Sequence, residues 1–221
     1  MQEEQYNQIQ LQKLQSSIFT VKAHHYFISS DQNALGEVPD EFNPSSDSDT
    51  GGFNRNIEIV IGARIMLTRN INTDEGLVNG AVGIITSIEF STPDMSFPSV
   101  IFIKFDKPSI GKVTCKGENR IQSPISIFPI EHKFLYAGGE IVRKQYSIIL
   151  AWACTIHKVQ GLSLDRAVVD IGITIFDYGM AYVALNRVRS ISGLILSWLD
   201  THKIKASDSG IEEYERQTKR H

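Results

Sequence analysis

The sequence has little cysteine and no long apolar segment. Its 221 residues include only two cysteines, Cys115 and Cys154, and these do not form a metal-ligand spacing. This usage favours a reducing compartment, in which disulfides are rare. No apolar run approaches the ~20 residues that cross a bilayer, and the polar residues 1–15 resemble neither a secretory signal nor a transit peptide. The sequence therefore predicts a protein without disulfides, metal ligands or a membrane span.

A phosphate-binding loop is also missing. The pattern Gly-x-x-x-x-Gly-Lys-Ser/Thr, whose backbone amides cradle nucleotide phosphates, occurs nowhere in the chain. The only Gly-Lys pair, Gly111-Lys112, continues with Val113. We therefore expect that the chain by itself does not turn over a nucleotide.

The composition is ordinary, but the charge is unevenly distributed. Hydrophobic residues make up 42% of the chain and charged residues 21%, which is typical of one large globular domain or two small ones. The net charge is −3, yet residues 31–58 carry seven acidic side chains and one basic, whereas residues 143–189 carry six basic and three acidic. We expect phosphates to bind the second region; the alternative is that both are solvated surfaces.

The first two thirds of the chain read as short strands. A Gln-rich, helix-prone start is followed by a strand at 18–23, and residues 30–56 are rich in Ser, Asp, Asn, Pro and Gly, which predicts a long loop. Two strands turn at Gly62, Asn79-Gly80 marks a tight turn, and Gly83 is expected at a bulge. Short strands at this spacing predict a small β-barrel over about 76–146, with Lys104 exposed.

The last third alternates strands with helices. A strand at 147–150 leads to a helix that begins near Thr155, a second strand covers 166–172, a helix covers 178–190 and a closing strand covers 193–199. This alternation predicts a parallel α/β sheet. The tail 202–221 is polar, with a helix expected at 211–220.

Two polar clusters in this last third could bind phosphate. In Thr155-Ile156-His157-Lys158-Val159-Gln160-Gly161, a helix start with the Thr155 hydroxyl would form an anion site for a nucleotide or a nucleic-acid backbone. In the second cluster, residues 182–190, Arg187 and Arg189 are two apart and cannot share a helix face. One of them could act as an arginine finger in phosphoryl transfer. The alternatives are a capped surface helix and two solvated arginines.

Two other chemistries are weaker. Cys154 lies close to His157, as in a thiol nucleophile, but a cysteine between alanine and threonine more often packs as a small apolar residue. The pairs Asp40-Glu41 and Asp74-Glu75 could suggest a Mg²⁺ site, but neither follows an apolar strand.

The motifs together resemble a known family. The segments IGARIMLTRN, GLVNGAVGII, AWACTIHKVQGLSLDRAVVDIG and AYVALNRVRS occur in the order found in the C-terminal half of the petite-integration-frequency helicases, superfamily-one enzymes related to the bacterial RecD helicases. The resemblance covers about residues 57–200. It implies an α/β fold, the second RecA-like helicase domain with a parallel sheet, into which a small Src-homology-three-like β-barrel is inserted.

The resemblance also implies boundaries for the parts of the chain. These are an N-terminal part of the RecA-like domain (1–29), an acidic flexible loop (30–56), lead-in strands (57–75), the barrel (76–146), the RecA-like domain with the fifth and sixth helicase motifs (147–201) and a polar tail (202–221).

Roles for single residues follow from the resemblance in the same way. Thr155, His157 and Lys158 would touch the backbone of single-stranded DNA, with Asn79 and Tyr182 as further DNA-binding residues. Gln160 and Gly161 would lie near ATP, and Arg187 would be the catalytic finger, which also binds ATP. Two positions depart from the family pattern: Asn186 replaces a small hydroxyl residue, and Met180 replaces a glutamine.

The resemblance implies a portion of an ATP-dependent, five-prime to three-prime DNA helicase with roles in repair, recombination and telomere maintenance. In this family the phosphate loop and the Mg²⁺ carboxylates belong to a first RecA-like domain, which the sequence lacks, so ATP and Mg²⁺ would be cofactors of the full helicase only. The expected partners are that first domain and single-stranded or forked DNA, with no membrane. A nuclear location is expected, with a mitochondrial one as the alternative. The rival function is a stand-alone nucleic-acid-binding module without catalysis.

Overall fold

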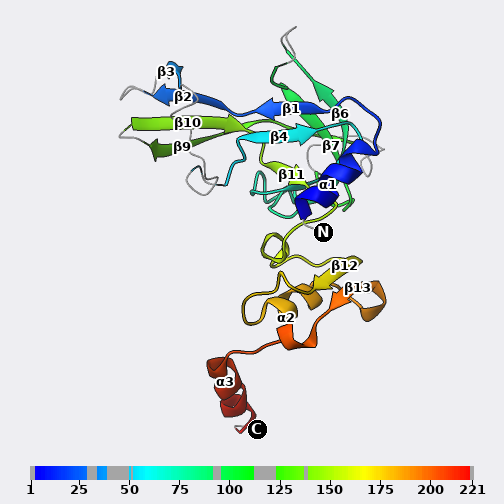
Figure 1. Ribbon diagram of the computed structural model, residues 1–221. Coiled ribbons are helices and arrows are strands. Elements are labelled where there is room, and N and C mark those ends of the chain that lie inside the picture. The colour runs from blue at the N-terminus through cyan, green and yellow to red at the C-terminus, as the bar shows by residue number, and fades with distance from the viewer. Residues whose placement is uncertain are drawn as a thin grey trace. The chain divides into compact units, whose positions relative to one another are not determined.

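The structure is a computed structural model that describes residues 3–28, 34–38, 50, 52–91, 96–111, 123–136 and 139–219. It divides into two compact units, residues 1–153 (unit 1) and residues 154–221 (unit 2). The architecture is mixed α/β and consists mostly of strands (Figure 1). In the described ranges no helix is long and apolar enough to cross a membrane.

Unit 1 begins with a helix and continues as strands. The helix is α1 (Glu3–Gln12), and the strands are β1 (Phe19–Lys22), β2 (His24–Ile28), β3 (Ala34–Glu37), β4 (Asn56–Ile59), β5 (Arg64–Leu67), β6 (Val82–Glu89), β7 (Val100–Phe105), β8 (Ile125–Ile127), β9 (Ile130–Tyr136), β10 (Gly139–Gln145) and β11 (Ile148–Leu150). The expected N-terminal helix and the strand at 18–23 are confirmed.

The strands of unit 1 form three antiparallel groups. Five strands pair in the order β11-β5-β6-β7-β8, four pair in the order β3-β2-β10-β9, and β1 pairs with β4. Figure 1 shows β2, β10 and β9 lying side by side, and α1 beside the other strands of the unit. The main core lies on the inner face of the five-stranded group, where Ile101, Ile103 and Phe105 of β7 point inward and Lys104 is exposed, as the alternation predicts.

Helix α1 is fixed by one apolar and one polar contact. Leu11 is fully buried in the core. Asn7, one turn earlier on the same side, is also buried; its Nδ2 donates to the Ala153 carbonyl (2.8 Å) and its Oδ1 accepts from the Ala153 amide (2.9 Å). Because this inward position is polar, the helix has only a weak apolar face in the sequence.

The glycines of unit 1 have different roles. Gly62 (φ 91°) and Gly80 (φ 86°) hold the left-handed conformations of the two turns that the sequence predicts. Gly83 pairs regularly with Ile65 and Phe105, so the predicted bulge is wrong at this position; the β6 bulge falls between Ile85 and Ser87. A Cβ at Gly83 would lie 2.7 Å from Ile103 Cγ2, so the glycine is needed for the close approach of β7.

The strands of the range 76–146 are shared between two sheets. Strands β6, β7 and β8 join β5 and β11, whereas β9 and β10 join β2 and β3. Both sheets therefore take strands from outside that range. Strand β11, at the start of the predicted α/β region 147–201, pairs antiparallel with β5 and belongs to a sheet of unit 1.

Most of the predicted loop 30–56 lies outside the described residues. Within it, Ala34–Glu37 form β3 and pair with β2, and β4 begins at Asn56. The loop prediction is wrong for these positions, because main-chain pairing with a neighbouring strand fixed them despite their polar surroundings.

The buried Arg143 ties Thr50 and Phe53 to the four-stranded sheet. Arg143 is fully buried; its Nε donates to His25 Nε2 (2.7 Å) and its Nη1 donates to Thr50 Oγ1 (2.8 Å) and to the Phe53 carbonyl (2.6 Å). The Phe53 ring contacts His132, the cross-strand neighbour of Arg143, at 5.8 Å between centroids.

Unit 2 is smaller and holds the motifs of the last third. Its elements are the 3-10 helices η3 (Ile156–Val159), η4 (Ile191–Gly193) and η5 (Thr201–Lys203), the strands β12 (Ala167–Ile171) and β13 (Leu194–Leu199), and the helices α2 (Met180–Leu185) and α3 (Asp208–Thr218). Strands β12 and β13 pair in parallel, as predicted. Ile171, Ile175, Met180 and Ala181 form its core.

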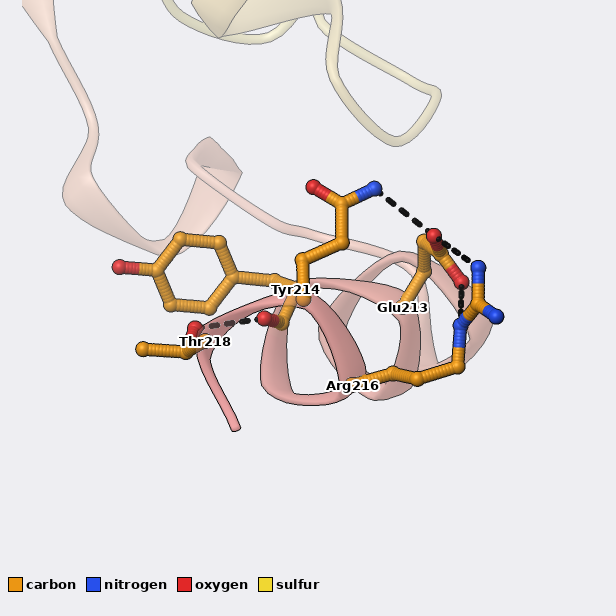
Figure 2. Close-up of polar contacts among 5 residues, drawn as sticks. Glu213, Tyr214, Arg216 and Thr218 are labelled. Atoms are coloured by element: carbon orange, nitrogen blue, oxygen red, sulfur yellow. Dashed lines mark hydrogen bonds and ion pairs between the residues drawn. The ribbon is translucent and has the colours of Figure 1, made fainter. Parts of the chain in front are cut away.

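The predicted helix in the tail is α3. Ser207 caps it by accepting from the Gly210 amide (3.2 Å). Figure 2 shows Arg216 reaching across to Glu213, with Nε–Oε2 at 2.6 Å, while the Thr218 hydroxyl donates to the Tyr214 carbonyl at 2.6 Å. The hydrogen bond from Arg216 lowers the pKa of Glu213. All these groups are exposed, so α3 is a solvated helix held by local contacts.

Candidate functional site

Thr155–Gly161 forms one turn that presents polar side chains to solvent. Val159 is buried and Ile156 packs on the core of unit 2, so the two apolar residues anchor η3. The polar members Thr155, His157, Lys158 and Gln160 are all exposed, and Gly161 (φ 82°) reverses the chain after them. The alternation of anchoring and exposed residues therefore gathers the predicted phosphate ligands at the surface.

The helix predicted to begin at Thr155 is a single 3-10 turn. The Thr155 hydroxyl caps no amide of η3. The Lys158 amide already donates to the Thr155 carbonyl (3.1 Å), and the Gln160 amide donates to the His157 carbonyl (3.3 Å). The prediction of an α-helix at this position is therefore wrong, because the segment forms a single 3-10 turn, whose aligned peptide dipoles are fewer. The prediction that the segment binds an anion stays a prediction.

An exposed aromatic residue accompanies His157. The ring of Phe176 lies 6.3 Å from the imidazole, between centroids, and its side chain is exposed. Sequence reasoning missed this neighbour, because the pair Ile175-Phe176 is more typical of a buried core. Cys154, considered as a nucleophile, is half-buried.

Arg187 lies against the end of the same segment. It lies two residues after the end of α2 and is half-buried; its Nε donates to the Val183 carbonyl (2.9 Å) and its Nη1 to the Leu162 carbonyl (3.3 Å). Main-chain bonds join the two segments nearby: the Leu164 amide donates to the Arg187 carbonyl (2.7 Å), and the Arg189 amide donates to the Leu164 carbonyl (3.0 Å). The two predicted motifs are therefore adjacent in space.

Arg189 has a different environment from Arg187, but neither lies on the predicted helix 178–190, because α2 ends at Leu185. Its Nη1 forms an exposed ion pair with Asp165 (3.0 Å). Such surface pairs contribute little to stability. Arg187 is thus the arginine held among carbonyl groups, and Arg189 is the one at the surface.

Helix α2 places the remaining residues of the second cluster. Ala181 and Ala184 are buried on one face, as predicted, and Met180 is also buried. Tyr182 is exposed, and its hydroxyl accepts from Asn186 Nδ2 (3.3 Å). The asparagine that departs from the family pattern therefore has a local contact with a predicted DNA-binding residue.

Asn79 belongs to unit 1. Its side chain is exposed in the turn before β6, and its amide donates to Asn70 Oδ1 (2.8 Å). The Gly80 amide donates to the Leu67 carbonyl (2.8 Å), which fixes the turn. Asn70 was not singled out from the sequence, although asparagine before such a turn is a common loop-organising residue. Unit 2 holds all the other predicted site residues, namely Thr155, His157, Lys158, Gln160, Gly161, Tyr182 and Arg187. Asn79 alone among them lies in unit 1. Among the described residues, no group of three or more His, Cys, Asp or Glu is placed to hold a metal ion.

Comparison with known proteins gives the family. The family model described as "DNA helicase Pif1, 2B domain" matches residues 51–88. The chain is 32% identical over 163 residues to the ATP-dependent DNA helicase PIF1 of Danio rerio, covering 73% of this chain and 22% of that protein. The chain thus spans less than a quarter of the length of this relative.

Solved structures show the same fold. The crystal structure of Pif1 helicase from Candida albicans matches with a TM-score of 0.71 at 23% identity, covering 97% of this chain and 47% of that one. Pif1 helicase from Bacteroides in complex with ADP-AlF3 and ssDNA matches with a TM-score of 0.59 at 22% identity, covering 99% and 44%. The fold therefore matches part of these solved structures. The chain belongs to the Pif1 family and corresponds to a portion that includes the 2B domain.

Proposed function

We propose that this chain is the C-terminal portion of an ATP-dependent, five-prime to three-prime DNA helicase, in which it supplies the arginine finger and part of the single-strand track. The observation that carries the proposal is the hydrogen bond from Arg187 Nη1 to the Leu162 carbonyl. It ties the arginine to the segment that presents Thr155, His157 and Lys158. One continuous region of unit 2 could then sense nucleotide and DNA together.

Arg187 suits the finger role because it is positioned but weakly engaged. A finger stabilises the charge that builds on the γ-phosphate during transfer. Its guanidinium now donates to neutral carbonyl groups, and bonds from arginine to phosphate oxygens are stronger than these. Gln160 lies two residues before Leu162, and Gly161 is next to Leu162. Both would line the same side of the nucleotide.

The exposed side chains of the η3 turn would follow the DNA backbone. Lys158 supplies a positive charge, and Thr155 and His157 supply hydrogen bonds to phosphate oxygens. Exposed Tyr182 would add a contact to that strand, and the exposed side chain of Asn79 in unit 1 would be a further DNA contact. The crystallised Bacteroides relative was bound to ssDNA.

The finer fold assignments belong to the same proposal. Unit 2, with the N-terminal residues 1–29, would form part of the second RecA-like domain, and the strands at 76–146 would form the inserted barrel. ATP and Mg²⁺ would be held by a first RecA-like domain that carries the phosphate loop. With one wall of the cleft only, the chain alone would not hydrolyse ATP. A nuclear location would follow from a DNA substrate.

The isolated chain can test this proposal. Fluorescence anisotropy with a labelled single-stranded oligonucleotide is expected to show binding that weakens with salt, and an ATPase assay with and without that oligonucleotide is expected to show no turnover. Robust ATP turnover that is lost in Arg187→Ala would contradict the proposal that hydrolysis also needs a first RecA-like domain. Binding without any contribution to turnover in a complete helicase would instead support a stand-alone nucleic-acid-binding module.

A further inference from the structure

Two aromatic rings of unit 2 are each carried by an isoleucine of the same core. Ile175 is buried in that core and Ile156 packs against it. The next residue along the chain is Phe176 in the first case and His157 in the second, and both of these side chains are exposed. The Ile175 amide also donates to the Gly172 carbonyl (3.1 Å), which closes a turn just before Phe176. The two segments are therefore fixed, while the rings that they carry face solvent.

The two rings lie beside each other and leave most of the phenyl ring uncovered. Their centroids are 6.3 Å apart and their planes are inclined by 32°, which is within the range of paired aromatic side chains. Phe176 is 79% exposed, although phenylalanine is among the residues most often fully buried. An aromatic ring that is held in place and left exposed is suited to stacking with a planar ligand.

The charges around this ring suit a nucleic acid. Thr155 and Lys158 are exposed on the η3 turn and offer the hydrogen bonds and the positive charge that phosphates take. Asp177, the residue after Phe176, is exposed and acidic, and its carboxylate repels phosphate. We therefore expect phosphates on the η3 turn and an uncharged base over Phe176.

We propose that Phe176, with His157 beside it, stacks against one base of a single-stranded nucleic acid whose phosphates lie along the η3 turn. The inference rests on the proposed function and adds a contact with a base to the proposed contacts of Thr155, His157 and Lys158 with phosphates. Every base has a face that can stack, so this contact would hold a single strand without selecting a sequence.

A protein partner fits this loop less well than a nucleic acid does. Ile173 and Tyr178 are exposed in the same loop as Phe176, so a protein surface could cover all three side chains. Such a surface would also remove water from the polar side chains of the η3 turn, which costs free energy unless each of them finds a partner. A single strand meets the ring with a base and the polar side chains with its phosphates.

The adenine of ATP is another source of a base, and the position of the ring disfavours it. Phe176 lies beside His157, near the start of the segment 155–161. Arg187, the proposed finger, is bonded to the Leu162 carbonyl, just after the end of that segment. Contacts with the strand and contacts with the nucleotide would therefore lie toward opposite ends of the segment.

Two oligonucleotides separate stacking from phosphate contacts. Labelled oligothymidine and a labelled abasic strand with the same number of phosphates would be titrated with the full chain and followed by fluorescence anisotropy. The unsubstituted chain should bind oligothymidine more tightly, because only that strand offers bases. Phe176→Ala should weaken binding to oligothymidine about tenfold and leave binding to the abasic strand unchanged.

Three further variants show whether the ring itself is responsible. Phe176→Tyr keeps an aromatic ring and should keep the preference for oligothymidine. Phe176→Leu keeps an apolar side chain without the ring and should lose the preference, as Phe176→Ala does. Ile173→Ala, at a residue of the same loop that is 90% exposed, is the matched control and should leave the preference unchanged.

The outcomes distinguish this inference from the proposed function. Phe176→Ala that binds oligothymidine normally, or that loses affinity equally for both strands, would overturn the inference, as would an equal loss in Ile173→Ala. A loss in Phe176→Ala that is confined to a fluorescent ATP analogue would assign the ring to the nucleotide and overturn the inference as well. Equal affinities of the unsubstituted chain for the two strands would overturn the inference alone. Binding of neither strand would contradict the proposed function itself.

Discussion

Single residues in unit 2 carry the proposed contacts with DNA, and Lys158 is the one whose charge is simplest to test. Removing one phosphate contact should weaken binding to single-stranded DNA for all sequences alike and reduce the slope of log K against log salt by ~0.7. Lys158→Ala is therefore expected to show a lower affinity and a shallower salt slope in anisotropy titrations. Lys219→Ala, at an exposed lysine at the end of α3, is the control. An unchanged slope of log K against log salt in Lys158→Ala would show that Lys158 does not contact a phosphate of the DNA.

His132 makes the stability of unit 1 depend on pH. Burial, and then the charge of Arg69, lower the pKa of His132 below its ordinary value of 6.5. The folded state therefore favours the neutral imidazole, and the unfolded chain binds more protons below pH 6.5. The free energy of unfolding should be at its full value above pH 6.5 and should fall as pH drops below it.

Urea unfolding at several pH values between ~5 and ~7.5 checks this dependence, since the window is set by the histidine titration. His132→Gln should reduce the slope of the free energy of unfolding against pH. His202→Gln, at an exposed histidine of unit 2, should leave that slope unchanged. A slope that is the same in both variants would show that another group controls it.

At the scale of elements, strands β6 and β7 approach each other closely at Gly83. A methyl group at Gly83 would meet Ile103 Cγ2 and the Lys104 carbonyl, each at 2.7 Å. Gly83→Ala should therefore lower the free energy of unfolding by ~1–3 kcal/mol, the usual cost of overpacking. Ser87→Ala on the same strand is the control. Denaturant unfolding that ranks the two variants equally would mean that β7 moves away at little cost.

Helix α1 depends on the two hydrogen bonds between Asn7 and the Ala153 main chain. Asn7→Ala leaves a buried amide and carbonyl unpaired, so we expect a loss of ~1–3 kcal/mol and faster amide exchange in α1. Asn7→Asp keeps the acceptor but not the donor. Its free energy of unfolding should therefore lie between that of the unsubstituted chain and that of Asn7→Ala. Gln5→Ala, on the exposed side of α1, should leave both quantities unchanged.

Local sequence patterns predicted where strands and turns lie better than they predicted which strands pair with each other. The alternation around Lys104, the glycine turns and the parallel pair β12–β13 could all be read from the sequence, because each depends on residues close together in the chain. The pairing of β11 with β5 and the division of strands between two sheets could not, because register between distant strands is fixed by packing. The η3 turn was misread because Ile156 and Val159 are three residues apart, a spacing that fits one face of an α-helix and of a 3-10 turn equally.

At the scale of the whole molecule, the family and the fold rest on agreement between independent observations. The motif order suggested the Pif1 family, the family model matches residues 51–88, and the fold matches part of a solved Pif1 helicase. The proximity of Arg187 to the segment after Gly161 could be anticipated only through the resemblance, because no local pattern specifies a contact across 25 residues of chain.

The most direct test of the central claim places this chain within a complete helicase. In Danio rerio PIF1, the matched stretch would be replaced by the corresponding residues of this chain, and DNA-stimulated ATP turnover would be measured with Arg187, Arg187→Ala and Arg189→Ala. The account predicts turnover with Arg187 intact, a loss of ~10³-fold or more in Arg187→Ala, and little change in Arg189→Ala. A chimera that is inactive with Arg187 intact, or one that keeps its turnover in Arg187→Ala, would contradict it.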